Sequence, residues 1–194
     1  MTEILLFHHV QGLTTGLVEF ADRLRAAGHT VHTPDLFEGR TFATIPEGMT
    51  YVNRDDAPDY DALADRIVRD LPAELVYAGF SFGGGQAQRL AQLRPGACGA
   101  LLFDTCFPIS GEWAFGPWPA GVPVQVHGMD RDPFFAEEGG DLDAARELVA
   151  SVDEAELFID PGDQHLFADS SLSSYDEEAA TLLTERVLAF LSRI

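Results

Sequence analysis

The sequence predicts an α/β protein in which a parallel β-sheet is covered by helices on both faces. Six short apolar runs, typical of buried strands, alternate with longer segments whose apolar residues recur at helical spacing. No two of these runs are joined by a hairpin turn, which favours parallel pairing. The 194 residues contain no interdomain linker, internal repeat or low-complexity tract. We therefore expect one domain, residues 1–194.

The element ranges follow from the same patterns. We expect strands over residues 3–9, 29–33, 74–78, 98–104, 122–128 and 156–160. We expect a glycine-bearing loop over residues 11–16 and, after it, a helix to about residue 27; further helices are expected over residues 59–71, 86–93, 141–152 and 175–193. Residues 35–58 are expected to be irregular, as a lid, a binding loop or a tolerated insertion. Residues 106–121 are rich in proline and glycine, which predicts a loop.

The segment Gly79-Phe80-Ser81-Phe82-Gly83 lies between an expected strand and an expected helix. A serine with glycines two residues before and after it, in this context, is the pattern of a nucleophile elbow. A side chain at either glycine would crowd the returning backbone, and the Phe82 N–H would point into the same space as the serine oxygen, where it can serve an oxyanion. The alternative is a glycine-rich turn whose serine only caps a helix.

A serine nucleophile requires a base and an acid that orients it, in the chain order serine, acid, histidine. Of the two histidines after Ser81, His127 precedes every plausible acid except Asp104 and lies within an expected strand, which favours a structural role. His165 follows the last strand. The acid is Asp130 or Asp132. We favour Asp132, because the proline after it holds its backbone extended, whereas Asp130 could pair with its neighbour or face water.

An oxyanion formed at Ser81 would need two N–H donors, and we expect them from Phe82 and from the loop near Val10. Aromatic residues could form an apolar pocket around the serine. The candidates are Tyr51, Phe80, Phe82, Phe107, Trp113 and Trp118. The two tryptophans could instead cover a hydrophobic edge.

The charge of the chain limits its partners. Twelve basic and thirty-two acidic residues give a formal net charge of -20, which opposes binding to nucleic acid or anionic membranes and favours neutral or cationic substrates. Cys98 and Cys106 lack metal-ligand spacing, and no signal peptide or membrane span is apparent. We expect a cytoplasmic monomer or homodimer that acts on a small molecule.

Four segments together resemble one known family: residues 28–37, containing Pro-Asp-Leu-Phe; residues 79–84; Asp132-Pro133-Phe134; and residues 162–167, Gly-Asp-Gln-His-Leu-Phe. With them, nearly the whole chain resembles the dienelactone hydrolase family. The resemblance implies a compact α/β-hydrolase fold, with a six-stranded parallel sheet and helices on both faces. It also implies a triad of Ser81, Asp132 and His165, oxyanion donors at Val10 and Phe82, and no metal or organic cofactor.

Three positions depart from the founding enzymes of that family. Ser81 stands where they have a cysteine, His9 where they have a glutamate near the nucleophile, and Asp169 where an arginine helps to bind the lactone carboxylate. His9 could contact the pocket or cap a strand. An acidic residue at position 169 would repel a carboxylate, so a carboxylate-bearing dienelactone is not the expected substrate.

The expected activity is hydrolysis of a small ester or lactone through an acyl-enzyme on Ser81. Two alternatives remain. The chain could be a non-catalytic binding module on a hydrolase fold, or an acyltransferase that uses the same triad.

Overall fold

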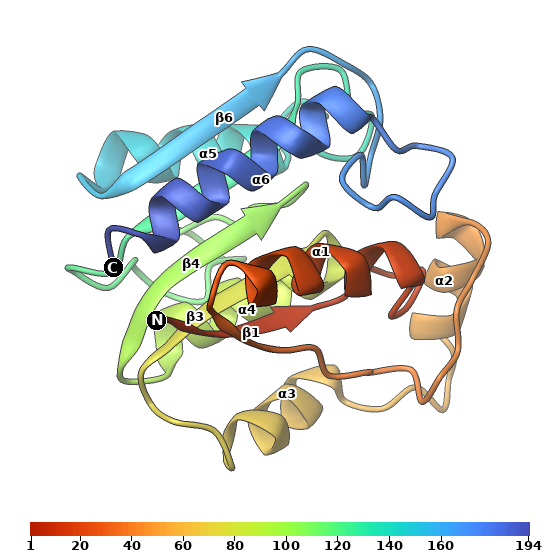
Figure 1. Cartoon of the computed structure of the whole chain (residues 1–194), viewed down its shortest axis with the longest axis horizontal. Coiled ribbons are helices and arrows are strands. Elements are labelled where there is room, and N and C mark those ends of the chain that lie inside the picture. Colours follow the sequence, from red (N-terminus) through yellow and green to blue (C-terminus); the bar gives the residue numbers. More distant parts are fainter.

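The computed structural model describes all 194 residues and contains one six-stranded parallel sheet (Figure 1). The strand order is β2-β1-β3-β4-β5-β6, and every neighbouring pair is parallel. The strands are β1 (Glu3–Phe7), β2 (Thr30–His32), β3 (Leu75–Phe80), β4 (Ala97–Phe103), β5 (Val124–Met129) and β6 (Ala155–Asp160). The expected six-stranded parallel sheet is confirmed.

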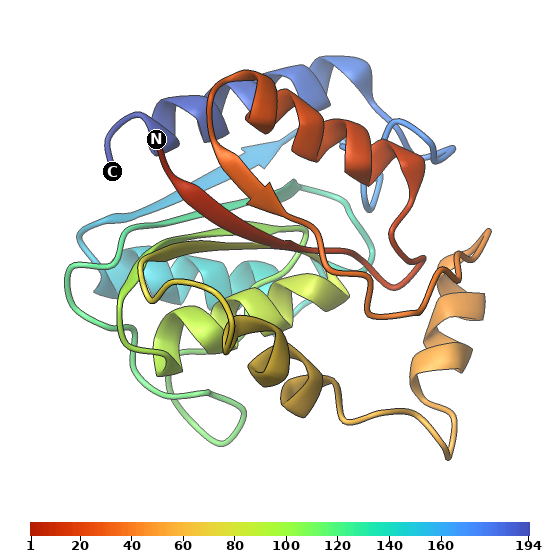
Figure 2. The ribbon, with the colours of Figure 1, turned by 60° about the horizontal axis from the view of Figure 1, so that its bottom comes forward.

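Helices cover both faces of the sheet, as Figure 2 shows. On one face lie α1 (Thr15–Ala26) and α6 (Glu177–Leu191). On the other lie α3 (Tyr60–Val68), α4 (Phe82–Leu93) and α5 (Asp141–Ser151). None of the helices has the length and apolar character needed to cross a membrane.

The two helical layers enclose two separate hydrophobic cores, because successive strand residues point to opposite faces of the sheet. In β1, Leu5 and Phe7 pack in the core under α3, α4 and α5, whereas Ile4 and Leu6 pack in the core under α1 and α6. All four are fully buried, and each such side chain contributes about 1.5–3 kcal/mol to folding. Helices thus pack on both faces of the sheet, so its carboxyl edge is a rigid support for the loops that follow the strands.

The expectation of an irregular segment over residues 35–58 was wrong, because a helix, α2 (Ile45–Val52), lies within it. Thr44 accepts the Glu47 N–H, and the Glu47 side chain accepts the Thr44 N–H, so the two residues form a capping box. Pro46 in the first turn adds a second helix-start signal. The Thr-x-x-Glu pattern was therefore present in the sequence. In Figure 1, α2 lies beyond the carboxyl end of β1.

Candidate active site

Ser81 occupies a strained turn between β3 and α4, at the carboxyl edge of the sheet. Its φ of +47° lies in a region that costs a residue with a side chain about 1–3 kcal/mol. A Cβ atom at Gly79 would lie 2.3 Å from the Gly83 carbonyl oxygen, and one at Gly83 would lie 2.4 Å from the His8 carbonyl oxygen. Only glycine at both positions allows the backbone segments to approach this closely.

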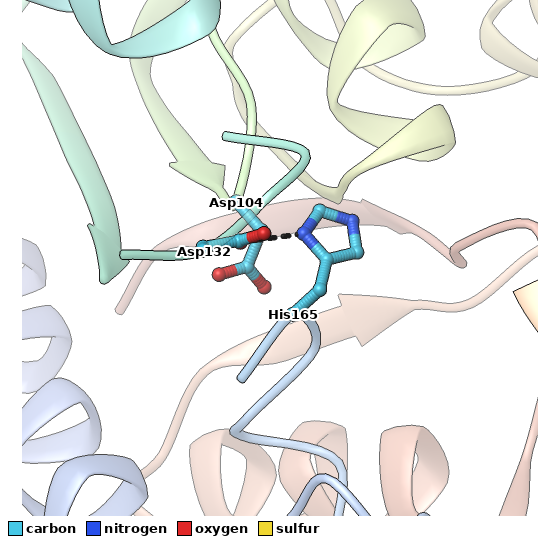
Figure 3. Close-up of side chains that lie close together, drawn as sticks. All are labelled: Asp104, Asp132 and His165. Carbon is cyan, nitrogen blue, oxygen red and sulfur yellow. Dashed lines mark hydrogen bonds and ion pairs between the residues drawn. The ribbon is translucent and has the colours of Figure 1, made fainter. Parts of the chain in front are cut away.

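The side chains of Ser81, His165 and Asp132 form one chain of hydrogen bonds. His165 Nε2 lies 2.8 Å from Ser81 Oγ, and His165 Nδ1 lies 2.6 Å from Asp132 Oδ2. Because Asp132 accepts at Nδ1, that nitrogen carries the proton, and Nε2 is left to accept from the serine hydroxyl. Figure 3 shows the bond between Asp132 and His165. The arrangement can remove the proton from Ser81.

Asp132 and Asp130 have different surroundings. Asp132 is fully buried, and its other carboxylate oxygen accepts the Phe134 N–H at 2.8 Å. Asp130 is exposed, pairs with Arg131 at 3.1 Å, and accepts the Gly162 N–H at 2.9 Å. The structure therefore brings Asp132, and not Asp130, to His165. Asp130 instead braces the turn that follows β6.

The pKa of His165 results from opposing effects. Burial lowers the pKa of the imidazole. The hydrogen bond to Asp132 and the charges of Asp104, Asp132 and Asp141 raise it by more than burial lowers it, so the net shift is upward. A raised pKa makes neutral His165 a stronger base. The nearby carboxylates therefore outweigh burial and keep His165 a competent base.

Two backbone N–H groups are candidates for an oxyanion site. Phe82 is the first residue of α4, so its N–H has no acceptor within the helix. Val10 lies outside every helix and strand, and its N–H donates to no protein acceptor. Val10 and Phe82 line the same pocket as Ser81 and His165. Free backbone donors on residues that line one pocket are candidates for binding a developing oxyanion.

The pocket at Ser81 has a volume of about 430 Å³ and is mainly apolar. Phe82 and Phe107 line it, as the sequence predicted. Sequence reasoning did not identify its other lining residues, which are Ile45, Met49, Asp61, Gly85, Gln86, Thr105, Phe115 and Phe134. None of the lining residues is lysine or arginine.

The other predicted pocket aromatics lie elsewhere. Phe80 is buried in the core under α1 and α6, where its ring centroid is 4.4 Å from that of Phe103. Tyr51 packs against Phe37, with the Arg54 guanidinium 3.8 Å from its ring centroid. The tryptophans also lie outside the pocket: Trp113 is 78% exposed, and Trp118 is buried with its indole N–H bonded to the Val122 carbonyl.

His9 and Asp169 do not line the pocket either; both are buried and bond to each other. His9 Nδ1 accepts the Gln11 N–H, so His9 Nε2 donates to Asp169 Oδ2 at 2.8 Å. The Thr14 hydroxyl also donates to this carboxylate. Burial alone would raise the pKa of Asp169. The hydrogen bonds from His9, Ser171 and Thr14 outweigh this effect, so the net shift of the pKa is downward. Asp169 therefore does not present its charge to a substrate in the pocket.

One acidic residue at the site was not predicted. Asp104 follows β4, is fully enclosed, and lies beside Asp132 and His165 (Figure 3). Its place after a parallel strand, at the edge where functional side chains gather, is the signal that could have identified it. The ligand atoms of these three residues lie within 4.8 Å of one another, the one cluster in the chain compact enough to share a metal ion. The bond between Asp132 and His165 occupies two of its members.

Solved structures share this fold at low sequence identity. A dienelactone hydrolase-like promiscuous phosphotriesterase from metagenomic libraries is 18% identical, with a TM-score of 0.73 over 100% of this chain and 86% of that one. Esterase Est2 from Thermogutta terrifontis, with butyrate bound, is 17% identical, with a TM-score of 0.66 over 99% and 83%. A thioesterase domain from the curacin biosynthetic pathway is 16% identical, with a TM-score of 0.62 over 96% and 90%. The fold is the α/β-hydrolase fold.

Sequence comparison identifies the family. Among proteins with curated descriptions, none matches this chain. The sequence profile of the dienelactone hydrolase family matches residues 1–194, which is the whole chain. On this match, and with a fold of the same type, the protein belongs to the dienelactone hydrolase family.

Proposed function

We propose that this protein is a serine hydrolase that cleaves a small, uncharged ester or lactone through an acyl-enzyme on Ser81. The observation that carries the proposal is the continuous hydrogen-bond chain from Asp132 through His165 to Ser81. The strained backbone at Ser81 supports it, because such strain persists at functional sites.

The first half of the reaction forms the acyl-enzyme. His165 Nε2 takes the proton of the Ser81 hydroxyl as Oγ bonds to the substrate carbonyl carbon. The N–H groups of Val10 and Phe82 then donate to the oxyanion. When the intermediate collapses, the bond to the leaving oxygen breaks and Nε2 returns the proton to that oxygen. Asp132 keeps the proton of Nδ1 in place and stabilises the imidazolium.

The second half repeats these steps with water. His165 takes a proton from a water molecule whose oxygen bonds to the acyl carbon, and the same donors hold the second oxyanion. The bond between that carbon and Ser81 Oγ then breaks, and His165 returns the proton to the serine. In a lactone, the leaving oxygen of the first half stays attached to the acyl group, and the product is one hydroxy acid.

The lining of the pocket favours an apolar, uncharged acyl group. Phe107, Phe115 and Phe134 offer aromatic surface, while the charged side chain in the lining is the carboxylate of Asp61. Because no lysine or arginine lines the pocket, a carboxylate-bearing dienelactone would meet no fixed positive charge there and would be repelled by Asp61. The butyrate described in the Thermogutta terrifontis esterase makes short acyl esters the first substrates to test.

A second cleft favours a polar leaving group. It meets the pocket at Ile45, Phe134 and His165. Its polar lining residues are Gln11, Thr44, Asp163, Gln164, Ser173 and Ser174. Because His165 protonates the leaving oxygen, the alcohol would depart on this side. The proposed substrate therefore joins an apolar acyl group to a neutral or cationic polar alcohol.

The test compares Ser81→Ala with the wild-type enzyme on p-nitrophenyl acetate and butyrate. We expect kcat to fall by on the order of 10⁴- to 10⁶-fold while circular dichroism shows an unchanged fold. Ser110→Ala is the control, since it removes an exposed hydroxyl that bonds only to Glu147. Hydrolysis by folded Ser81→Ala at the wild-type rate would refute the proposal.

A further inference from the structure

Asp104 is a buried acid that the mechanism above does not use. It lies immediately after β4, and its own N–H donates to the His127 carbonyl at 2.8 Å. Its side chain lies beside both Asp132 and the His165 ring, as Figure 3 shows. A carboxyl group at this depth has no access to water, since Asp104 is only 2% exposed.

The surroundings of Asp104 do not explain it as a structural residue. Neither carboxyl oxygen has a well-formed hydrogen bond, the Leu166 N–H being the one donor near enough to act on the group, although buried polar groups are nearly always paired. Burying an unpaired carboxyl costs free energy, and the backbone adds to that cost because Asp104 has a φ of +56°. Leu166, which follows His165, has a φ of +63°. Backbone strain at Asp104 and at the residue that follows His165 is typical of a functional arrangement.

We propose that Asp104 is a positioning residue for His165, a second acid that stabilises the imidazolium formed during the reaction. When Asp132 is removed, Asp104 accepts the hydrogen bond from Nδ1 in its place. The inference rests on the proposed hydrolase function and extends it, because one imidazole would then be served by two acids from two different strands.

The charges around the pair support this role. The groups that act on His165 are Asp132, Asp104 and, from the start of α5, Asp141. Asp141 is engaged elsewhere, because it accepts the Cys106 N–H and a hydrogen bond from Thr105. The ring of His127 bonds to Gln125 along β5 and also does not pair with Asp104. His165 is thus the one cation-forming group available to Asp104.

The protonation of Asp104 follows from its position. Burial is the main effect that raises its pKa, to about 7, and the charge of Asp132 adds to it, while His165 and the N–H of Leu166 act in the opposite direction. Near neutral pH the carboxyl is therefore balanced between its two forms. When His165 takes the proton of Ser81, the positive imidazolium favours the ionised form of Asp104, and the new ion pair stabilises the charged intermediate.

The decisive test is a set of variants assayed on p-nitrophenyl butyrate: Asp104→Asn, Asp132→Ala and the double variant. With a single acid, loss of that acid should cost on the order of 10⁴-fold in kcat. If Asp104 can replace Asp132, we expect Asp132→Ala to lower kcat by only about 10- to 100-fold and the double variant to lower it by the full factor of about 10⁴. If Asp132→Ala is as inactive as the double variant, the inference is refuted.

A second readout is the pH at which His165 titrates, measured by NMR without turnover and, in parallel, by kinetics. In Asp104→Asn, the histidine loses a charge that raises its pKa, so the NMR titration of the His165 ring and the acid limb of kcat/KM should both move to lower pH. A merely structural role would leave both midpoints unchanged, and that result would also refute the inference. Asp104→Leu, which needs no hydrogen-bond partner, should give the same shift and guards against misfolding of the first variant. If Ser81→Ala remains active, the proposed function fails; if only these tests fail, the proposed function stands without a second acid.

Discussion

Gly48 in α2 packs directly against the carbonyl group of Val10. A Cβ atom at Gly48 would lie 2.1 Å from the Val10 carbonyl oxygen, so no other residue fits without moving the backbone. Helix α2, which the sequence analysis did not predict, therefore packs against the loop that carries a proposed oxyanion donor. Its position ties residues 45–52 to the geometry of the site.

Gly48→Ala should reduce activity without weakening the helix. Alanine favours helix formation over glycine by about 1 kcal/mol, yet its methyl group would push α2 and Val10 apart. We expect kcat to fall about tenfold or more, because small displacements of a catalytic group are costly. Thr50→Ala is the control, because its hydroxyl bonds only to Pro46 within the same helix. An unchanged kcat in Gly48→Ala would show that the Val10 loop does not need this contact.

The bond between His9 and Asp169 links the same loop to the segment that carries His165. His9 precedes Val10, and Asp169 lies shortly after His165 in the turn that follows β6. We expect Asp169→Asn to lower kcat by about tenfold with little change in KM, because the two halves of the site would lose their alignment. Ser170→Ala, which removes only a hydroxyl bonded to Glu19, is the matched control. Equal kinetics for the two variants would mean that the link is not needed for catalysis.

The positions of Ser81, His165 and Asp132 could be predicted because chain order and strand ends determine them. In a parallel sheet, the carboxyl ends of β3, β5 and β6 lie at one edge, so residues that follow these strands meet there. The same rule applies to Asp104 after β4, but an isolated aspartate has no surrounding motif to mark it. Its place after a strand makes it a candidate, and its burial and its missing partners, which only the structure shows, set it apart from other aspartates.

The pocket was harder to predict, because it depends on where each side chain points. Phe80 and Phe82 both flank Ser81, yet strand alternation turns Phe80 into the core under α1 and α6. That alternation was available in the sequence. The placement of Phe115 and Trp113 could not be predicted from the sequence, because a proline- and glycine-rich loop has no periodicity from which side-chain direction can be inferred.

The burial of Asp104 should appear in the pH dependence of stability. The pKa is about 7 in the folded protein and has an ordinary value of 3.8 in the unfolded chain. Between those values the folded protein holds a proton that the unfolded chain has lost, so this group lowers the free energy of unfolding as the pH rises. Asp104→Asn removes the effect. The variant should gain stability over the wild type from about pH 4 upward, reaching at most roughly 4 kcal/mol near pH 8.

Urea unfolding at several pH values measures this difference. The control is Asp153→Asn, an exposed residue whose substitution should change stability by less than about 0.5 kcal/mol. If the difference between Asp104→Asn and the wild type does not vary with pH, the carboxyl does not hold a raised pKa.

Phe115 and Trp113 lie two residues apart in one loop but have different predicted effects on substrate choice. Phe115 lines the pocket, whereas Trp113 is exposed. We expect Phe115→Ala to lower kcat/KM for p-nitrophenyl butyrate more than for the acetate, because the longer chain loses more apolar contact. The ratio of kcat/KM between the two esters should change by about 10-fold. Trp113→Ala should leave the ratio between the two esters unchanged. The opposite pattern would place the acyl group outside the pocket.

The nucleophile itself can be tested by covalent labelling. A fluorophosphonate reacts with an activated serine. Intact-mass analysis of the folded protein should detect one adduct per chain, and peptide mapping should locate it at Ser81. Ser81→Ala should remain unlabelled, and Ser110→Ala should react like the wild type. Absence of an adduct on the folded wild-type protein, or an adduct at another residue, would contradict the assignment of Ser81 as the nucleophile.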